Sequence, residues 1–140
     1  MDLYTKKIIE LASTIPFSRR LKNPQVTVTR RTPICGSSIT VDMNISAGKI
    51  LEFGQKINAC ALGQASTSIV TKEIIGRDRA EIEKLLTSVK EMLTSNGPTP
   101  HAPFSDYEAL SPAKNYKNRH ASIMLILYTI IDAFETHEIN

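Results

Sequence analysis

The sequence is poor in cysteine and holds no long apolar run. With only two cysteines among 140 residues, Cys35 and Cys60, the chain cannot form a disulfide framework. In a reducing compartment such a pair serves as metal ligands, redox groups or core residues. The longest apolar stretch, Ile123 to Leu127, is too short to span a bilayer, and Met1 to Lys7 contain no apolar signal region. We therefore expect a cytoplasmic protein that does not insert into membranes.

An excess of charge of one sign is also missing. The 17 basic and 14 acidic side chains give a net charge of only +3, and the basic residues are scattered, so a nucleic acid partner is not expected. The sequence contains no glycine-rich phosphate loop, and Gly36-Ser37-Ser38 lacks the frame of a nucleophile elbow. Because no acid–base pair or cofactor fingerprint is present either, we expect no enzymatic turnover by the isolated chain.

The apolar pattern predicts one domain over residues 1–140 that contains both helices and a sheet. Apolar residues recur at helical spacing from Leu3 to Ile15, and this helix should end before Pro16. Alternating patterns then predict three strands, over residues 25–31, 37–45 and 49–57. Short connections between these strands predict an antiparallel meander.

The second strand has the clearest alternation. One face carries Ile39, Val41, Met43 and Ile45, and the other carries Ser38, Thr40, Asp42 and Asn44. A strand with this pattern packs its apolar face on the core and exposes its polar face to water. We therefore expect the polar face of the sheet to be solvated.

Helical patterns follow the sheet. A helix should begin at Ala61, and Gly76 precedes a second helix for which Asp78 and Glu81 form a capping box. Residues 99–118 contain three prolines and few apolar side chains, which predicts a long loop with one turn at residues 106–110. The last helix should open at Arg119.

Three possible metal ligands stand at the ends of these elements. Cys60 lies where strand gives way to helix, and unpaired backbone N–H groups there favour a thiolate. The hairpin should bring Cys35 to the same end of the sheet. His120 opens the last helix, and two thiolates with an imidazole suit zinc or an iron–sulfur cluster. The gaps of 24 and 59 residues match no compact metal motif, so a core or capping role stays open.

The order of these motifs resembles that of a known family. Cys35-Gly36, a hairpin, the stretch from Cys60 to Ser66, a helix pair and the stretch from His120 to Ile123 follow one another as in the IscU, NifU and SufU iron–sulfur cluster scaffold proteins. The resemblance extends from about Tyr4 to Phe134. Its most specific part is the second cysteine motif, Cys60-Ala61-Leu62-Gly63-Gln64-Ala65-Ser66.

This resemblance implies both a fold and a function. The fold would be α+β, of the SufE/NifU-like type, with a three-stranded antiparallel sheet and helices packed on one side. The protein would receive sulfur from a cysteine desulfurase, hold a nascent [2Fe–2S] cluster, iron or Zn²⁺, and pass its cargo to acceptor proteins. Cys35, Cys60 and His120 match ligands of the family, which implies that they bind the metal or cluster. We expect a monomer or a weak homodimer.

Two positions depart from the family pattern. Ser37 stands where the family has aspartate. The third cysteine is replaced by Ala121 if His120 is aligned with the family histidine, or by Ser122 in a gapless register through Glu108-Ala109-Leu110. Two rival functions therefore stay open, a zinc-containing sulfur acceptor for a desulfurase and an adaptor that docks on a desulfurase without holding a cluster.

Overall fold

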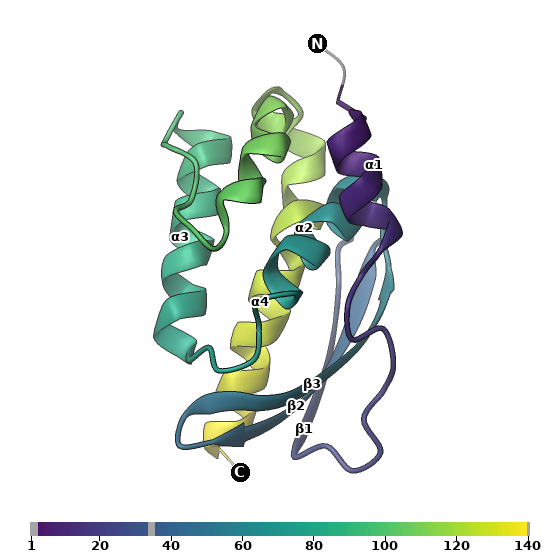
Figure 1. Cartoon of the computed structure of the whole chain (residues 1–140), viewed down its shortest axis with the longest axis vertical. Helices are drawn as coiled ribbons and strands as arrows, with labels where there is room; N and C mark the ends of the chain where they lie inside the picture. Colours follow the sequence, from purple (N-terminus) through teal and green to yellow (C-terminus); the bar gives the residue numbers. More distant parts are fainter. Residues whose placement is uncertain (1–2, 34–35, 140) are drawn as a thin grey trace.

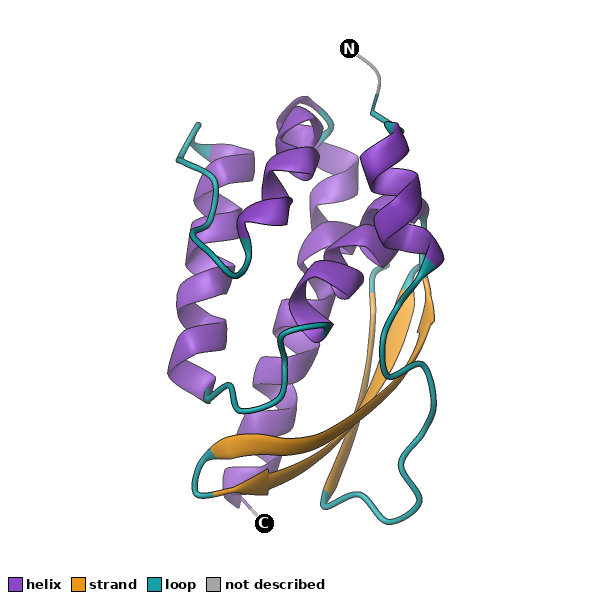
Figure 2. Cartoon of the chain, in the orientation of Figure 1, coloured by secondary structure: helices purple, strands orange, loops and turns teal. Residues whose placement is uncertain are grey.

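A three-stranded sheet with helices on one of its faces forms the frame of the molecule (Figures 1 and 2). The computed structural model describes residues 3–33 and 36–139. In chain order the elements are α1 (Lys6–Ser13), β1 (Val26–Arg31), β2 (Ser38–Ser46), β3 (Lys49–Asn58), α2 (Ala61–Thr71), α3 (Arg79–Thr94), the 3₁₀ helix η1 (Ser105–Asn115) and α4 (Lys117–Ile139). This is the α+β arrangement that the resemblance implied.

The sheet is the antiparallel meander that the alternating patterns predict. Its strand order is β1-β2-β3, so β1 and β3 are the edge strands. Val41 of β2 lies between Val28 of β1 and Gln55 of β3. At one end of the sheet Ser38 pairs with Asn58, which brings the chain just before β2 and the chain just after β3 to the same place.

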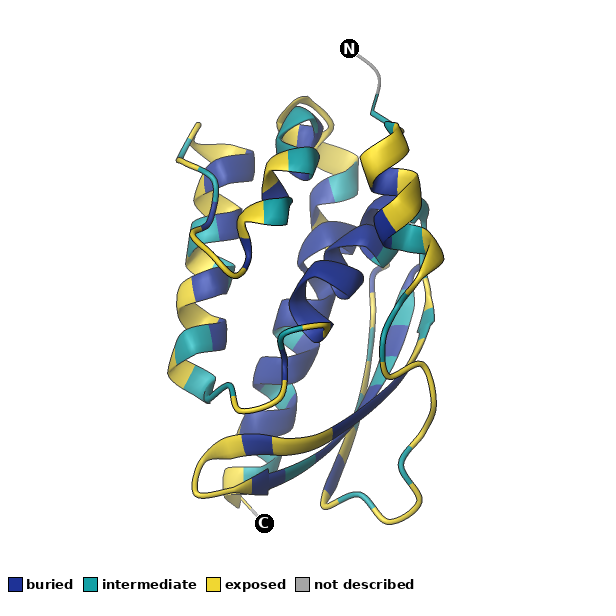
Figure 3. Cartoon of the chain, in the orientation of Figure 1, coloured by how far each residue is buried: buried dark blue, intermediate teal, exposed yellow. Residues whose placement is uncertain are grey.

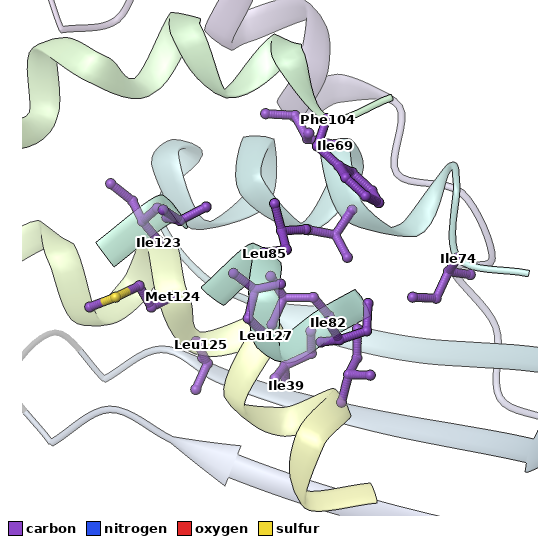
Figure 4. Close-up of a cluster of buried hydrophobic side chains, with 14 of the residues drawn as sticks. Ile39, Ile69, Ile74, Ile82, Leu85, Phe104, Ile123, Met124, Leu125 and Leu127 are labelled. Carbon is purple, nitrogen blue, oxygen red and sulfur yellow. The ribbon is translucent and has the colours of Figure 1, made fainter. Parts of the chain in front are cut away.

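The core lies between the apolar face of the sheet and the helices. Ile39, Val41 and Met43 of β2 are all buried, and Figure 3 shows nearly all of α2 and much of α4 in the colour of buried residues. Figure 4 shows Ile69 of α2 and Leu127 of α4 within this core. The capping box predicted for α3 is present, since the Asp78 side chain accepts from the Glu81 amide and the Glu81 side chain accepts from the Asp78 amide.

An ion pair also fastens the sheet to the last helix. The Nη1 atom of Arg30 in β1 lies 2.8 Å from a carboxylate oxygen of Asp132 in α4, and the guanidinium lies 4.7 Å from the centre of the Tyr128 ring.

Although α4 is the longest helix, no helix within the described residues is both long and apolar enough to cross a membrane.

The polar face of the sheet differs from the prediction at its centre. Asp42 lies on that face as expected, yet it is fully buried because the loop of residues 14–25 crosses over it. Its carboxylate accepts hydrogen bonds from Arg20 Nε at 2.7 Å, Arg20 Nη2 at 3.0 Å, the Leu21 amide at 3.0 Å and the Thr27 hydroxyl at 2.6 Å. A buried carboxylate needs such partners, and together they hold the loop on the sheet.

The segment predicted as a long loop is also more regular than expected. Residues 105–115 form the 3₁₀ helix η1, and α4 begins at Lys117, two residues before the predicted start. Tyr107, Leu110 and Ala113 are buried, and their three-residue spacing places them on one face of a helix with three residues per turn. This spacing explains why a segment with few apolar residues still packs on the core.

Candidate functional site

Cys60 occupies the N-cap position of α2. Its backbone is extended, with φ −66° and ψ 168°, and its side chain makes no capping hydrogen bond. The Cys60 carbonyl accepts from the Gln64 amide at 2.9 Å, which starts the helix. The residue is also partly exposed, so its thiol is free of a capping role and is not enclosed in the core. The predicted helix start at Ala61 is thus confirmed.

A serine hydroxyl from the last helix lies beside this thiol. Ser122 Oγ is 3.5 Å from Cys60 Sγ and 3.1 Å from Ser37 Oγ. Ser37 precedes β2 and Ser122 lies in α4, so three separate elements meet at the thiol. Both serines are only 2% exposed. The fold therefore builds a chain of two hydroxyl groups that leads from the end of the sheet to Cys60.

Gly63 allows the two helices to approach each other at this point. A Cβ atom on Gly63 would lie 2.5 Å from Ser122 Oγ and 3.1 Å from the Ser122 carbonyl oxygen. The contact of 2.5 Å is shorter than real Cβ atoms make, so a side chain at residue 63 would push Ser122 and α4 away from α2. The position of Ser122 beside Cys60 depends on this close approach.

A second buried hydroxyl network holds the same helices together one turn further on. Ser66 Oγ of α2 donates to the Ile123 carbonyl at 2.6 Å, and it accepts from the Tyr107 hydroxyl of η1 at 2.7 Å. Burial raises the pKa of Tyr107, and the hydrogen bond with Ser66 offsets only part of this rise. Tyr107 therefore remains a neutral donor that locks η1 against α2.

Cys35, the other predicted thiol ligand, lies outside the described residues. The expectation that the two sulfurs share one end of the sheet stays a prediction. The neighbouring chain agrees with it in one respect, because Ser37, two residues after Cys35, and Cys60 both contact Ser122.

His120 lies in the first turns of α4 and is 8% exposed. Its Nε2 atom is 2.9 Å from the carbonyl oxygen of Ala113. Because a carbonyl oxygen can only accept, Nε2 carries the proton and donates, which leaves Nδ1 as the only ring nitrogen with a free lone pair in the neutral imidazole. No contact between His120 and Cys60 is recorded among the described residues, and Ala121 is exposed.

The described part of the chain thus supplies one soft donor and two hydroxyl groups. Within residues 3–33 and 36–139 no group of three His, Cys, Asp or Glu side chains could hold a metal ion. A thiolate at Cys60 can act as a metal ligand or as a nucleophile toward sulfur, whereas a neutral serine hydroxyl binds soft metals poorly. Any complete metal site must therefore include a donor from outside this part, and Cys35 is the predicted one.

The sequence carries only weak signals for two of these residues. Ser122 is an alternative to Ala121 for the third cysteine, and Gly63 is one residue of the second cysteine motif. The signal for Ser122 is the gapless register through Glu108-Ala109-Leu110, a segment that forms part of η1 in the structure. Gly63 could not be singled out because its role depends on a contact with a residue far away in the sequence.

Comparisons with known proteins identify the family of this chain. The model of the NifU-like N terminal domain family matches residues 3–122. The curated iron–sulfur cluster assembly scaffold protein IscU of Thermotoga maritima is 25% identical over 134 residues, which cover 95% of this chain and 93% of that protein.

Solved structures give the same result. A nitrogen-fixing NifU-like protein (N-terminal) from Brucella abortus superposes with a TM-score of 0.94 at 33% identity, covering 99% of this chain and 96% of the other. A putative iron–sulfur cluster assembly scaffold protein for the SUF system from Fervidobacterium islandicum AW-1 superposes with a TM-score of 0.83 at 20% identity, covering 94% and 96%. The family match over most of the chain confirms the resemblance read from the cysteine motifs, and the protein belongs to the NifU-like N terminal domain family of scaffold proteins.

Proposed function

We propose that this chain is an iron–sulfur cluster assembly scaffold that holds a nascent [2Fe–2S] cluster, or iron, as cargo through Cys60. The observation that carries the proposal is the placement of a partly exposed thiol at the N-cap of α2, where the end of the sheet meets α4. A thiolate at this position would be both a soft, negatively charged metal ligand and a nucleophile toward sulfur.

The proposed ligands are Cys60, Cys35 and His120. Cys60 would be the principal one, since a thiolate adds a full negative charge and a soft donor. Cys35 is assigned by the family motif alone. His120 could contribute only through Nδ1, because its Nε2 proton is held by the Ala113 carbonyl. That hydrogen bond would fix the ring and its tautomer, as partners of metal-bound histidines commonly do.

Sulfur would arrive from a cysteine desulfurase as a persulfide. In this step the Cys60 thiolate attacks the outer sulfur of the enzyme's cysteine persulfide. A new S–S bond forms on Cys60, the S–S bond on the enzyme breaks, and the enzyme's cysteine leaves as a thiolate. No oxidant is needed because the sulfane sulfur is transferred without a change in its oxidation state. Cluster acceptor proteins would then take the completed cargo.

The cargo should be held more weakly than at a site with three thiolates. Ser122 stands beside Cys60, where a third thiolate would complete the site, and it is neutral. A site with less negative charge binds Fe²⁺, Fe³⁺ or Zn²⁺ less tightly. The lower negative charge of the site favours transfer of the cluster to an acceptor over its storage. It also keeps the zinc-containing sulfur acceptor as a second candidate.

Anaerobic reconstitution with iron and sulfide tests the proposal. We expect the wild-type chain to gain bound iron, bound sulfide and visible absorbance, the Cys60→Ser variant to gain none of them, and the His120→Ala variant to gain a cluster that is lost sooner. Two control measurements accompany this test. The first is the zinc content of protein purified without oxygen. The second is the transfer of one sulfur atom from a desulfurase to Cys60, which mass spectrometry detects.

Two outcomes would replace the proposal. Zinc in the purified protein, with persulfide formed on Cys60 and no cluster after reconstitution, would make the chain a sulfur acceptor. A variant with both Cys35→Ser and Cys60→Ser that still binds the desulfurase and still supports biological function would make it an adaptor without cluster chemistry.

A further inference from the structure

A groove borders the edge of the sheet just before Cys60. It has a volume of about 680 Å³ and lies between the end of α1, the loop of residues 16–20 and the last part of β3. Ile15 and Ile57 contribute apolar surface to it, and Gln64, in the first turn of α2, lines the side toward Cys60. Figure 1 shows the chain leaving α1 and passing along this side of the sheet.

The outer edge of β3 presents backbone groups without a partner strand in this groove. The Gln55 amide points away from β2, because it donates to the carbonyl oxygens of Phe17 and Arg19, each at 3.1 Å. Backbone groups of an antiparallel strand alternate in direction, so the amide and carbonyl of Ile57 point the same way. For the Ile57 amide no hydrogen bond is recorded within the described chain, and an unpaired edge of this kind can accept a further strand.

Every charged side chain that lines the groove is basic. Arg20 forms an ion pair with Asp42 and donates two hydrogen bonds to its carboxylate. Arg19 and Lys56 are exposed, and neither forms an ion pair with any residue that the structure describes. Since the whole chain has a net charge of only +3, two uncompensated cations beside one open strand edge create a local preference for an anionic partner.

We infer that this groove is a docking site for a short acidic segment of a partner protein, bound in an extended conformation as an added strand on Ile57. Main-chain hydrogen bonds to Ile57 would supply the register, and carboxylates on alternate residues would face Arg19 and Lys56. Because Ile57 precedes Cys60 by three residues, the segment would hold its parent protein next to the thiol. The inference does not require that Cys60 carries a cluster.

An NMR titration of the ¹⁵N-labelled full chain, kept metal-free with a chelator and reductant, tests this inference. The probe is a capped five-residue peptide of alternating glutamate and valine. We expect saturable shifts centred on the amides of Lys56 and Ile57. Arg19→Glu and Lys56→Glu should each weaken binding about tenfold or more, as expected for the loss of one ion pair and its reversal to repulsion. Lys90→Glu, an exposed change on α3, is the matched control and should have no effect.

The strand pairing has its own test. Ile57→Pro removes the open amide without removing a bond to β2, and proline is tolerated at strand edges. This change should abolish the shifts. If the variant does not fold, methylation of alternate backbone nitrogens in the peptide tests the same hydrogen bonds on the wild-type chain. Equal binding of a lysine and valine peptide, shifts confined to another surface, or no saturable shift at about 1 mM peptide would each overturn the inference. Failure here would leave cluster reconstitution unaffected.

Discussion

At the scale of single residues, the two serines beside Cys60 contact each other. The resemblance places Ser37 where the family has aspartate, and Ser122 is one of the two alternatives for the missing third cysteine. Their hydroxyl oxygens are 3.1 Å apart. An aspartate and a thiolate at this distance would repel each other, whereas two hydroxyls form a hydrogen bond. If Ser122 stands for the third cysteine, the pair would replace two ionisable groups by a neutral contact beside Cys60.

Gly63 makes this contact possible, and its replacement gives a test with a clear sign. In an exposed helix, Gly→Ala stabilises a protein by about 0.5–1 kcal/mol. We expect Gly63→Ala instead to lower the free energy of unfolding by about 1–3 kcal/mol, because the new methyl group meets Ser122 Oγ at 2.5 Å. Urea unfolding followed by circular dichroism measures this difference.

A double-mutant cycle separates the contact from other causes. Ser122→Ala removes the nearest atom, so Gly63→Ala should cost less in that background than in the wild type. If the two costs are equal, or if Gly63→Ala stabilises the protein, α2 and α4 do not approach as closely at this point as the structure has them.

At the scale of elements, the loop that crosses the outer face of the sheet depends on Asp42. Burial by itself raises the pKa of this carboxyl, but the hydrogen bonds from Arg20, Thr27 and the Leu21 amide, with the charge of Arg20, bring it below its ordinary value. The charged form is thus favoured in the folded state. The loop also needs Gly54, because a Cβ there would lie 2.5 Å from the Arg19 carbonyl oxygen.

This depressed pKa gives the fold an acid-sensitive contribution. Because the folded-state pKa lies below that of the unfolded chain, about 3.9, the stabilisation is fully present above that value and is lost as pH falls through the folded-state pKa. We expect Asp42→Asn to cost about 2–3 kcal/mol at pH 7 and less at about pH 3. Urea unfolding at both pH values measures it, with the exposed Glu91→Gln as control. An equal cost at both pH values would contradict the assignment.

The helices and strands could be predicted from the sequence to within a few residues wherever the apolar residues recurred with a clear period. The alternation in β2 and the capping box of Asp78 and Glu81 are local signals, and both are confirmed. The burial of Asp42 and the helix η1 could not be predicted in the same way. The first depends on a loop that comes from another part of the chain, and the second follows a period of three, which is rare in long segments.

At the scale of the whole molecule, the candidate site is a junction of three parts of the chain. The meander brings the chain before β2 and the chain after β3 to one end of the sheet, and this could be predicted from the hairpin. The choice between Ala121 and Ser122 could not, because it depends on how α4 is rotated against α2. Ser122 contacts Cys60, and Ala121 is exposed.

The lifetime of a reconstituted cluster in two cysteine variants tests the central claim, that the cargo is held at the junction of Cys60 and Ser122. A thiolate at residue 122 would lie beside Cys60 and add a negative soft donor, so Ser122→Cys should prolong the anaerobic cluster lifetime about tenfold or more. Ala121→Cys adds the same thiol at the neighbouring residue and is the matched control, with a lifetime close to that of the wild type. If Ala121→Cys prolongs the cluster lifetime and Ser122→Cys leaves it at the wild-type value, the cargo lies on the other side of α4 and the account is contradicted.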